Sequence, residues 1–501
     1  MKLPLKWLKE YVEFDISVEE FVDKMIMRGF KIAEVIDEMP NINNVFVCKV
    51  LKIVQHENAD KLRVCTVDIG RENTLQIVTN ATNLFEGAVV PVAACGAKLS
   101  GNLEIKNTVM RGVTSEGMFC GGHELNLKDV DVKGASDDGI LLLNDESMVG
   151  KTIQDALGLN SVIFDIEITP NRQDCQSIIG ICREAAAALG KKFIEPTIKH
   201  VEGEGNEKEF ASVTIENPQL CPRYAARVIK NIKIEPSPLW MQKKLKSVGL
   251  RAINNIVDIT NYVLMEYGHP MHAFDLACVD NGAIVVRNAC EGEKITTLDG
   301  VERQTTPEML LIADPKKGVG LAGVMGGENS EITNDTKAVL FESAAFIAGN
   351  IRRTSRKLGV VSDSAQRFMR GVEPINAYLA LERAVELVQE LGAGTVVGEV
   401  IDVNYADVTQ RAIEVDTKRI NRIIGEEFSP EYMAKMLESI NIESKVKGDS
   451  LVVDVPHFRV DIESGIESDH DIAEEVARLH GYDRLTATLM SGRTFSGKLE
   501  S

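Results

Sequence analysis

The sequence contains no C-x-x-C pair, no internal repeat and no apolar run of about 18 residues, the length a membrane span requires. We therefore expect no segment that crosses a membrane. The nine cysteines are odd in number and most stand among apolar neighbours, which indicates reduced, buried thiols of a cytoplasmic protein. Hydrophobic residues make up 44% of the chain and charged residues 26%, which excludes a disordered or collagen-like chain.

Acidic side chains outnumber basic ones by 75 to 56, so the formal net charge is −19. This balance argues against non-specific coating of nucleic acid but allows a local basic groove. A chain of 501 residues is long enough for about three or four domains.

Changes of pattern along the sequence predict a multidomain α+β protein. Between residues 39 and 150, β-rich runs recur about every ten residues with turn residues between them, which favours a small β-barrel. Four of these runs are residues 45–54, 63–69, 74–80 and 88–95. The predicted parts are an N-terminal α+β domain (1–38 and 151–200), the β-barrel domain (39–150), a large mixed α/β domain (210–400), a small α+β domain (405–485) and a polar linker to further domains (486–501).

Three segments have the residues that begin or end helices. Residues 376–394 have an apolar stripe at helical spacing, and Gly392 is expected to end that helix. Another helix is expected to end at Gly190. A third is expected to begin near Asp471, which has capping-box spacing to Glu474.

Two segments of the barrel domain combine basic residues with glycines. HENADKLRVCTVDIG (56–70) contains Lys61 and Arg63, and MRGVTSEGMFCGGHEL (110–125) contains Arg111 and Ser115. Glycines and a hydroxyl between strands let the backbone approach a ligand closely, and the three cations can meet phosphate. From the residues alone, a plain barrel loop with structural glycines is the simpler interpretation.

Two features of the large domain invite a chemical interpretation. His269 and His272 are spaced like a metal pair, but Pro270 breaks a helical display and no further ligand stands nearby, so we reject a metal site. Glu342 follows Phe341 in an apolar segment. A carboxylate in that setting is either a paired structural group or a recognition group.

The longer motifs, taken in order, resemble one family. N-A-D-K-L-x-V-C-x-V-D-x-G followed by R-G-V-x-S-x-G-M-x-C resembles the OB-fold tRNA-binding domain of several synthetases and of free tRNA-binding proteins. The blocks after it resemble the segment that follows the OB domain, the B3/B4 domain and the end of the B5 domain in bacterial phenylalanyl-tRNA synthetase β subunits. These blocks are PNRQDCQSIIGICREAAA (170–187), GLRAINNIVDITNYVLMEYGHPMHAFD (249–275), LAGVMGG (321–327), FESAAF (341–346), SDSAQRFMRGVEP (362–374) and DIAEEVARLHGYDRL (471–485).

The resemblance implies a subunit of a ligase that charges phenylalanine tRNA in an ATP-dependent reaction. In that family, ATP is a substrate at the aminoacylation centre of a small α subunit, and two α and two β subunits assemble in the cytoplasm. The implied partners are phenylalanine tRNA and the α subunit. The family's β subunit continues into a catalytic-like and an anticodon-binding domain, which this sequence lacks. Two other classes stay open: a free-standing tRNA-binding, trans-editing hydrolase and a pure tRNA-binding module.

The resemblance also implies a site that hydrolyses tyrosine wrongly attached to phenylalanine tRNA. A pocket for phenylalanine rejects tyrosine poorly, because tyrosine only adds a hydroxyl, so a second, hydrolytic site is needed. We expect Glu342 to accept a hydrogen bond from that hydroxyl, and Asn261 and His272 to position the ester and a water. Backbone amides near Gly323 would stabilise the oxyanion. The implied site residues are Thr260, Asn261, His272, Ala322, Gly323, Glu342 and Ser364.

The resemblance implies a Mg²⁺ site near the predicted C-terminal helix. The implied ligands are Asp461, Asp471, Glu474 and Glu475. Three of them gather oxygens at helical spacing, which suits hard Mg²⁺, although the same spacing suits a capping box. The family has an aspartate six residues before the Asp471 position, where Gly465 stands here. We assign that role to Asp461, across a four-residue insertion, with Glu467 or Asp469 as alternatives.

Residues 351–371 contain six basic residues and one acidic residue. In a chain of net charge −19, this local excess predicts a phosphate track for the tRNA acceptor end. A solvated surface is the alternative.

Overall fold

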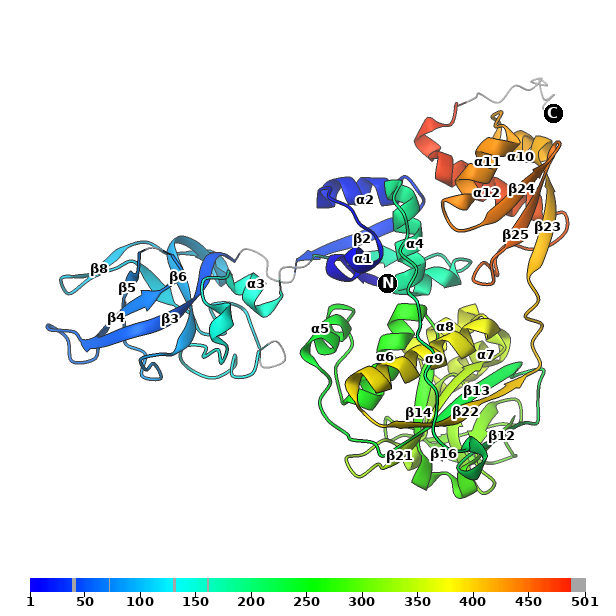
Figure 1. The fold of residues 1–501 in the computed structure, drawn as a ribbon, viewed down its shortest axis with the longest axis horizontal. Helices are drawn as coiled ribbons and strands as arrows, with labels where there is room; N and C mark the ends of the chain where they lie inside the picture. The colour runs from blue at the N-terminus through cyan, green and yellow to red at the C-terminus, as the bar shows by residue number, and fades with distance from the viewer. Residues whose placement is uncertain (38–41, 72, 129–131, 160–161, 488–501) are drawn as a thin grey trace, which may run out of the picture. The chain divides into compact units, whose positions relative to one another are not determined.

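The structure is a computed structural model that describes residues 1–37, 42–71, 73–128, 132–159 and 162–487 (Figure 1). Residues 488–501 of the predicted linker lie outside the described residues. The chain divides into two compact units, residues 35–163 and residues 1–34 with 164–501. Among the described helices, none has the length and hydropathy that crossing a membrane requires.

The unit of residues 35–163 is built on one curved sheet, with the strand order β10-β6-β3-β4-β5 and β7 beside β6. Its strands are β3 (Asn43–Gln55), β4 (Arg63–Asp68), β5 (Leu75–Thr79), β6 (Val89–Leu99), β7 (Leu103–Glu104) and β10 (Gly117–Phe119). The four predicted β-rich runs are therefore strands. Cys48, Val50 and Cys65 lie in a fully buried cluster inside the sheet, because alternate residues of a strand face the same side.

A hairpin of β8 (Thr108–Met110) and β9 (Val113–Ser115) brings the two ends of this sheet together. The amide of Glu116 donates to the Gln76 carbonyl of β5 over 2.9 Å. The amide of Val78 donates to the Ser115 hydroxyl over 3.0 Å. The end strands are thus linked, as expected for a small barrel. The unit also contains α3 (Ile153–Leu157).

The other unit begins with a three-stranded sheet of order β1-β11-β2. Its elements are β1 (Lys2–Pro4), α1 (Leu5–Tyr11), α2 (Val18–Ile26), β2 (Lys31–Asp37), β11 (Val162–Glu167) and α4 (Ile178–Leu189). The helix α4 is almost completely buried and ends at Gly190, which adopts φ 62°, as its sequence predicts.

Two sheets form the middle of this unit. One has the order β14-β21-β13-β22, with β13 (Arg223–Lys230), β14 (Met271–Asp275), β21 (Ala338–Ala345) and β22 (Thr395–Asn404). The other has the order β12-β15-β18-β19-β20, with β12 (Ser212–Ile215), β15 (Ala283–Asn288), β18 (Leu310–Ala313), β19 (Gly318–Leu321) and β20 (Met325–Gly326). A two-stranded sheet pairs β16 (Lys294–Thr296) with β17 (Glu302–Gln304).

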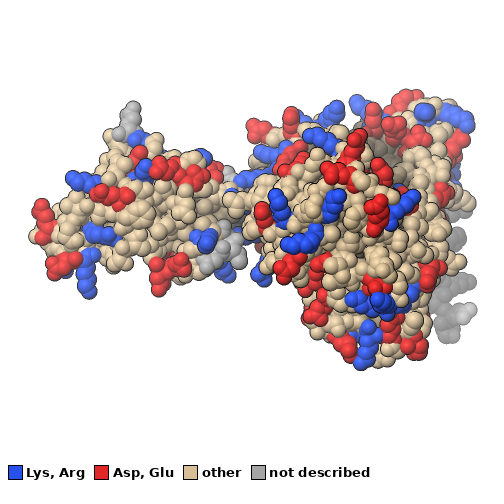
Figure 2. Space-filling model, turned by 60° about the horizontal axis from the view of Figure 1, so that its bottom comes forward, with Lys and Arg blue, Asp and Glu red and all other residues tan. Residues whose placement is uncertain are grey.

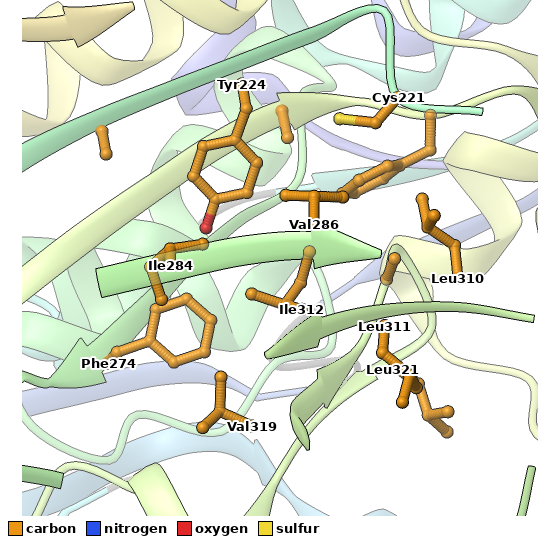
Figure 3. Close-up of a cluster of buried hydrophobic side chains, with 14 of the residues drawn as sticks. Cys221, Tyr224, Phe274, Ile284, Val286, Leu310, Leu311, Ile312, Val319 and Leu321 are labelled. Carbon is orange, nitrogen blue, oxygen red and sulfur yellow. The ribbon is translucent and has the colours of Figure 1, made fainter. Parts of the chain in front are cut away.

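Side chains of both sheets make one buried cluster (Figure 3). Tyr224 and Phe274 enter it from the four-stranded sheet, and Ile284 and Ile312 enter it from the other sheet. The helices of this region are α5 (Leu239–Ser247), α6 (Asn255–Tyr267), α7 (Ala348–Leu358), α8 (Asp363–Arg370) and α9 (Pro374–Leu391). Helix α9 ends at Gly392, as expected, and packs with α6 against the four-stranded sheet.

The C-terminal part has a three-stranded sheet of order β23-β25-β24. Its elements are β23 (Arg411–Asp416), α10 (Thr417–Ile424), α11 (Pro430–Glu438), β24 (Glu443–Lys447), β25 (Ser450–Val455) and α12 (Ser468–His480). Short 3₁₀ turns occur at 100–102, 146–148, 173–176, 207–209, 276–278, 280–282, 328–330 and 482–484.

The expected start of the last helix near Asp471 is wrong, because α12 begins at Ser468. The carbonyl of Glu467 accepts from the amide of Asp471 over 3.1 Å, so the helical hydrogen bonds start one turn earlier. Asp471 is not the N-cap. Its carboxylate instead accepts from the amide of Glu463 over 2.8 Å.

A cluster of buried ion pairs joins α4 to α12. Arg478 donates to both oxygens of Glu184, over 2.6 and 2.9 Å. Arg172 pairs with Asp174 and Glu184, and Arg459 pairs with Glu475 over 2.9 Å. Burial would raise the pKa of Glu184, but the Arg172 and Arg478 guanidinium groups hold it below its usual range. Each charge is compensated locally, which is the condition for keeping it away from water.

Replacing Glu184 with Ala is expected to lower the free energy of unfolding by about 3–5 kcal/mol, because Arg172 and Arg478 would keep their burial and lose a partner. Urea unfolding followed by far-UV circular dichroism measures the change. The matched control is Glu202→Ala, which removes an exposed carboxylate and should shift the transition little. Equal effects of the two substitutions would contradict a stabilising role for the cluster.

Candidate functional site

A small cavity of about 60 Å³ lies among β14, β19, β20, β21 and α8. A cavity of this size holds a few water molecules. Four of the seven predicted site residues line it, namely His272, Gly323, Glu342 and Ser364. The sequence places them on separate segments, and the pairing of β14 with β21 sets His272 directly opposite Glu342.

Glu342 is the only acidic residue that lines this cavity within the described chain. Its side chain is buried, and its Oε2 accepts a hydrogen bond of 2.6 Å from the hydroxyl of Tyr224 on the neighbouring strand β13. Burial raises the pKa of Glu342 to about 7, although the Tyr224 hydrogen bond opposes the shift. A carboxylate with this pKa changes charge near neutral pH.

His272 lies against the same cavity as a neutral imidazole. Burial lowers its pKa to about 4. Its Nε2 has no hydrogen-bond partner within the described residues, so it is available to a ligand or a water. A Cβ on Gly326 would come within 2.5 Å of the His272 ring, so only glycine fits there. His269 lines a different cavity from His272.

Gly323 forms a tight turn between β19 and β20. Its φ is 66°, and an added Cβ would lie 3.0 Å from the rings of Phe346 and Phe368. A side chain is therefore excluded on two grounds, conformation and space. The result is a stretch of bare backbone at the cavity wall.

Three predicted site residues do not line the cavity. Thr260 and Asn261 lie on α6, and the Thr260 hydroxyl donates to the Val257 carbonyl of the same helix over 2.7 Å. Ala322 is buried, and its amide donates to the Leu310 carbonyl. Their predicted contact with a substrate stays a prediction.

Tyr224 was not predicted from the sequence, and it is the direct partner of Glu342. A buried tyrosine needs an acceptor for its hydroxyl. A tyrosine in a buried strand such as β13 therefore indicates that an acceptor lies nearby, and this is the one signal that the sequence of β13 offers. The identity of the acceptor depends on the antiparallel pairing of β13 with β21. That pairing joins residues far apart in the sequence.

The predicted tRNA-binding residues in the unit of residues 35–163 fall into an exposed pair and a pair that is at least partly buried. Lys61 and Arg111 are exposed. Hydrogen bonds from His56 to the Met110 carbonyl and from Arg111 to the Asn58 carbonyl hold their two segments together. Arg63 is half-buried and donates to the Leu84 carbonyl, and Ser115 is buried with its hydroxyl between Val78 and Gly117. Only the first pair is open to phosphate without rearrangement.

The four predicted Mg²⁺ ligands do not form a ligand set. No three of their carboxylates come within 4.8 Å of one another in the described chain. Both oxygens of Asp461 accept from Arg459, and both oxygens of Glu475 accept from arginines of the buried cluster. Asp471 is bonded to a backbone amide and Glu474 is exposed. The arrangement therefore does not fit a Mg²⁺ ion within this chain.

The two alternative ligands are also engaged. Asp469 accepts from the amide of Asp416 over 3.0 Å and lies near Arg419. Glu467 pairs with His470 over 3.2 Å. One other group, Asp174, Cys175 and Glu184, brings two carboxylates and a thiol close together. Both carboxylates of this group form ion pairs with Arg172.

Comparison with known domain families gives three matches. The B3/4 domain matches residues 220–393, the "Putative tRNA binding domain" matches residues 45–151, and the tRNA synthetase B5 domain matches residues 413–482. The cavity around Glu342 lies within the first of these matches.

Curated relatives match almost the whole chain. The phenylalanine–tRNA ligase β subunit of Clostridium acetobutylicum is 43% identical over 495 residues, which are 99% of this chain and 61% of the relative. The phenylalanine–tRNA ligase β subunit of Geobacter sulfurreducens is 44% identical, with 99% and 61% coverage. That of Clostridium tetani is 41% identical and covers 100% of this chain. The chain thus spans about three-fifths of the length of these relatives.

Replacing Glu342 with Gln is expected to change how stability depends on pH. The pKa of Glu342 is about 7 in the folded chain against an ordinary value of 4.5. Between these values the folded chain binds more protons than the unfolded chain, so the free energy of unfolding falls as pH rises. The variant lacks this group and should exceed the parent chain in stability at pH 8 by roughly 1–3 kcal/mol.

Urea unfolding at pH 5 and pH 8 measures this difference. The matched control is Glu328→Gln, an exposed site whose replacement should leave the pH dependence unchanged. If Glu342→Gln and the parent chain lose the same stability between pH 5 and pH 8, the raised pKa is refuted.

Proposed function

We propose that the chain belongs to the phenylalanine–tRNA ligase β-subunit family, because it is 43–44% identical to curated β subunits over 99% of its length. In this proposal it supplies tRNA binding and editing to a ligase that charges phenylalanine tRNA. The presence of a tRNA-binding and a B3/4 domain in one chain supports this function. In this proposal the ATP-dependent step takes place on an α subunit, two α and two β subunits assemble, and the enzyme acts in the cytoplasm.

The proposed substrate of the cavity is the tyrosyl ester of phenylalanine tRNA. The observation that supports it is the pairing of Glu342 with a phenol: Tyr224 already donates to Oε2 over 2.6 Å. The other oxygen, Oε1, has no hydrogen-bond partner among the described residues and is not fully buried, and Glu342 lines the cavity. A tyrosyl hydroxyl can donate to it as Tyr224 does, whereas a phenylalanyl group leaves it without that hydrogen bond.

A water molecule is the proposed nucleophile, because the cavity lining includes no cysteine and its serine, Ser364, has no base as a partner among the described residues. With a pKa of about 4, His272 is neutral, and its Nε2 can accept a hydrogen bond from that water. The backbone amide of Gly323 is the proposed donor to the carbonyl oxygen of the ester, where negative charge develops. Asn261, Thr260 and Ala322 would contact the nucleotide end of the substrate beyond the cavity.

The resemblance implies Mg²⁺ with Asp461, Asp471, Glu474 and Glu475 as its ligands, and we do not propose that site for this chain. Their geometry in this chain does not support the assignment, because arginines occupy the oxygens of Asp461 and Glu475. No step of the proposed hydrolysis uses a metal ion.

A free-standing trans-editing hydrolase is the weaker alternative. It explains the cavity equally well. It does not explain a match to ligase β subunits that runs through the B5 domain and covers 99% of the chain.

The chain is expected to release tyrosine from phenylalanine tRNA that carries a tyrosyl ester, and to leave the phenylalanyl ester of the same tRNA intact. Glu342→Ala should lower kcat/KM for the tyrosyl ester about 10- to 100-fold, since a hydrogen bond to a charged group contributes about 1.5–3 kcal/mol. The activity of the parent chain should rise with pH through about 7, as Glu342 loses its proton. Release of labelled amino acid from each charged tRNA measures both effects.

The control is Ser343→Ala, which changes the adjacent residue of β21 on the opposite face of the strand. It should retain full activity. Equal hydrolysis of tyrosyl and phenylalanyl esters would contradict the proposed role of Glu342, and no release of tyrosine would contradict the editing function of this chain.

A further inference from the structure

Helix α7 presents four cations to solvent on one face. Arg352, Arg353, Arg356 and Lys357 are exposed, and we call them the α7 basic face. The opposite side of the helix is buried through Ile351, Thr354 and Ser355. The spacing of four residues between Arg352 and Arg356, and between Arg353 and Lys357, places the cations together.

These cations are not used in ion pairs. Within the described chain, none of the four lies within 4.0 Å of a carboxylate oxygen. Arg352 donates to the Met369 carbonyl and Lys357 to the Thr306 hydroxyl, both neutral acceptors. Elsewhere the two signs are mixed, as the face drawn in Figure 2 shows. In a chain of net charge −19, four uncompensated cations on one short helix form a local positive potential.

Helix stability explains only half of this face. Arg356 and Lys357 lie in the last turn, where cations interact favourably with the helix dipole. Arg352 and Arg353 lie in the middle of the helix and gain nothing from that dipole. An anionic partner explains all four.

The α7 basic face is attached to the wall of the cavity around Glu342. Helix α7 packs on α8, and the Arg352 side chain bonds to α8 at the Met369 carbonyl over 2.7 Å. Ser364 and Phe368 of α8 line the cavity. On α7 itself, Ile351 lies 3.1 Å from where a Cβ of Gly323 would be.

We propose that the α7 basic face binds the phosphodiester backbone of the RNA whose aminoacyl end enters the cavity around Glu342. This inference rests on the proposed function for the identity of the RNA and adds the surface that holds it. The face supplies affinity without sequence selection, because phosphate contacts position a nucleic acid and do not read its bases. It acts on binding, while Glu342 acts on the choice of amino acid.

The test compares Arg353→Gln/Arg356→Gln with Lys191→Gln/Lys192→Gln, which removes the same charge from another exposed pair. The full chain is used with tyrosyl-phenylalanine tRNA, and with an uncharged RNA hairpin that contains only the acceptor stem and its single-stranded 3′ end. The α7 variant should raise KM for the charged tRNA at least 10-fold and leave kcat unchanged.

Binding of the hairpin over a range of salt concentrations gives the second readout. Each phosphate contact contributes about 0.7–0.9 to the slope of log affinity against log salt concentration, so the α7 variant should lose about 1.5 from that slope. The Lys191 and Lys192 control should lose none. An α7 variant with the KM and the salt slope of the parent chain would overturn the proposal.

Failure of the proposed function is distinguishable. If the parent chain releases no tyrosine from charged tRNA, the editing function fails, and the salt slope of hairpin binding still decides the role of α7. The adenosine 3′-tyrosyl ester, which has no phosphodiester, provides a further check. Its hydrolysis should be the same in the parent chain and the α7 variant, and a loss there would assign α7 to the shape of the cavity instead.

Discussion

The candidate site depends on a carboxylate that is kept out of water with a phenol as its partner. Glu342 lies on a strand that is buried on both faces, and the hydroxyl of Tyr224 is its direct hydrogen-bond donor. The pairing of three adjacent strands brings Tyr224, Glu342 and His272 side by side. The cavity needs two further conditions, the missing side chains at Gly323 and Gly326. Polarity and space at this site are therefore set by the sheet and by the tight turn at Gly323.

Local features of the fold could be predicted from the sequence, because their causes are local. The alternating runs of residues 45–95 form strands, and Gly190 and Gly392 end helices in the left-handed conformation. The start of α12 was placed one turn too late, since Asp471 with Glu474 has the spacing of a cap. The chain uses the Glu467 carbonyl instead, in a turn that follows Gly465.

The candidate site could be predicted in part, through the resemblance to a family. His272, Gly323, Glu342 and Ser364 meet at one cavity, whereas Tyr224 was missed because its partner is 118 residues away in the sequence. Two of the predicted metal ligands pair with buried arginines instead of being free to bind a cation. Arg459 and Arg478 are buried and need carboxylates, and Asp461 and Glu475 satisfy that need. Spacing along a helix cannot reveal which cation a carboxylate faces.

The sheet of β1, β11 and β2 determines the order in which the chain can fold during synthesis. Its central strand, β11, is made from residues 162–167, while its two outer strands come from the first 37 residues. On a ribosome, β1 and β2 have no partner strand until the whole barrel unit has been synthesised, because both pair with β11. The barrel, which has its own core, can fold during that interval. β11 is synthesised only after the barrel unit, and only then can it pair with β1 and β2. The inserted domain can therefore fold before the domain that contains it.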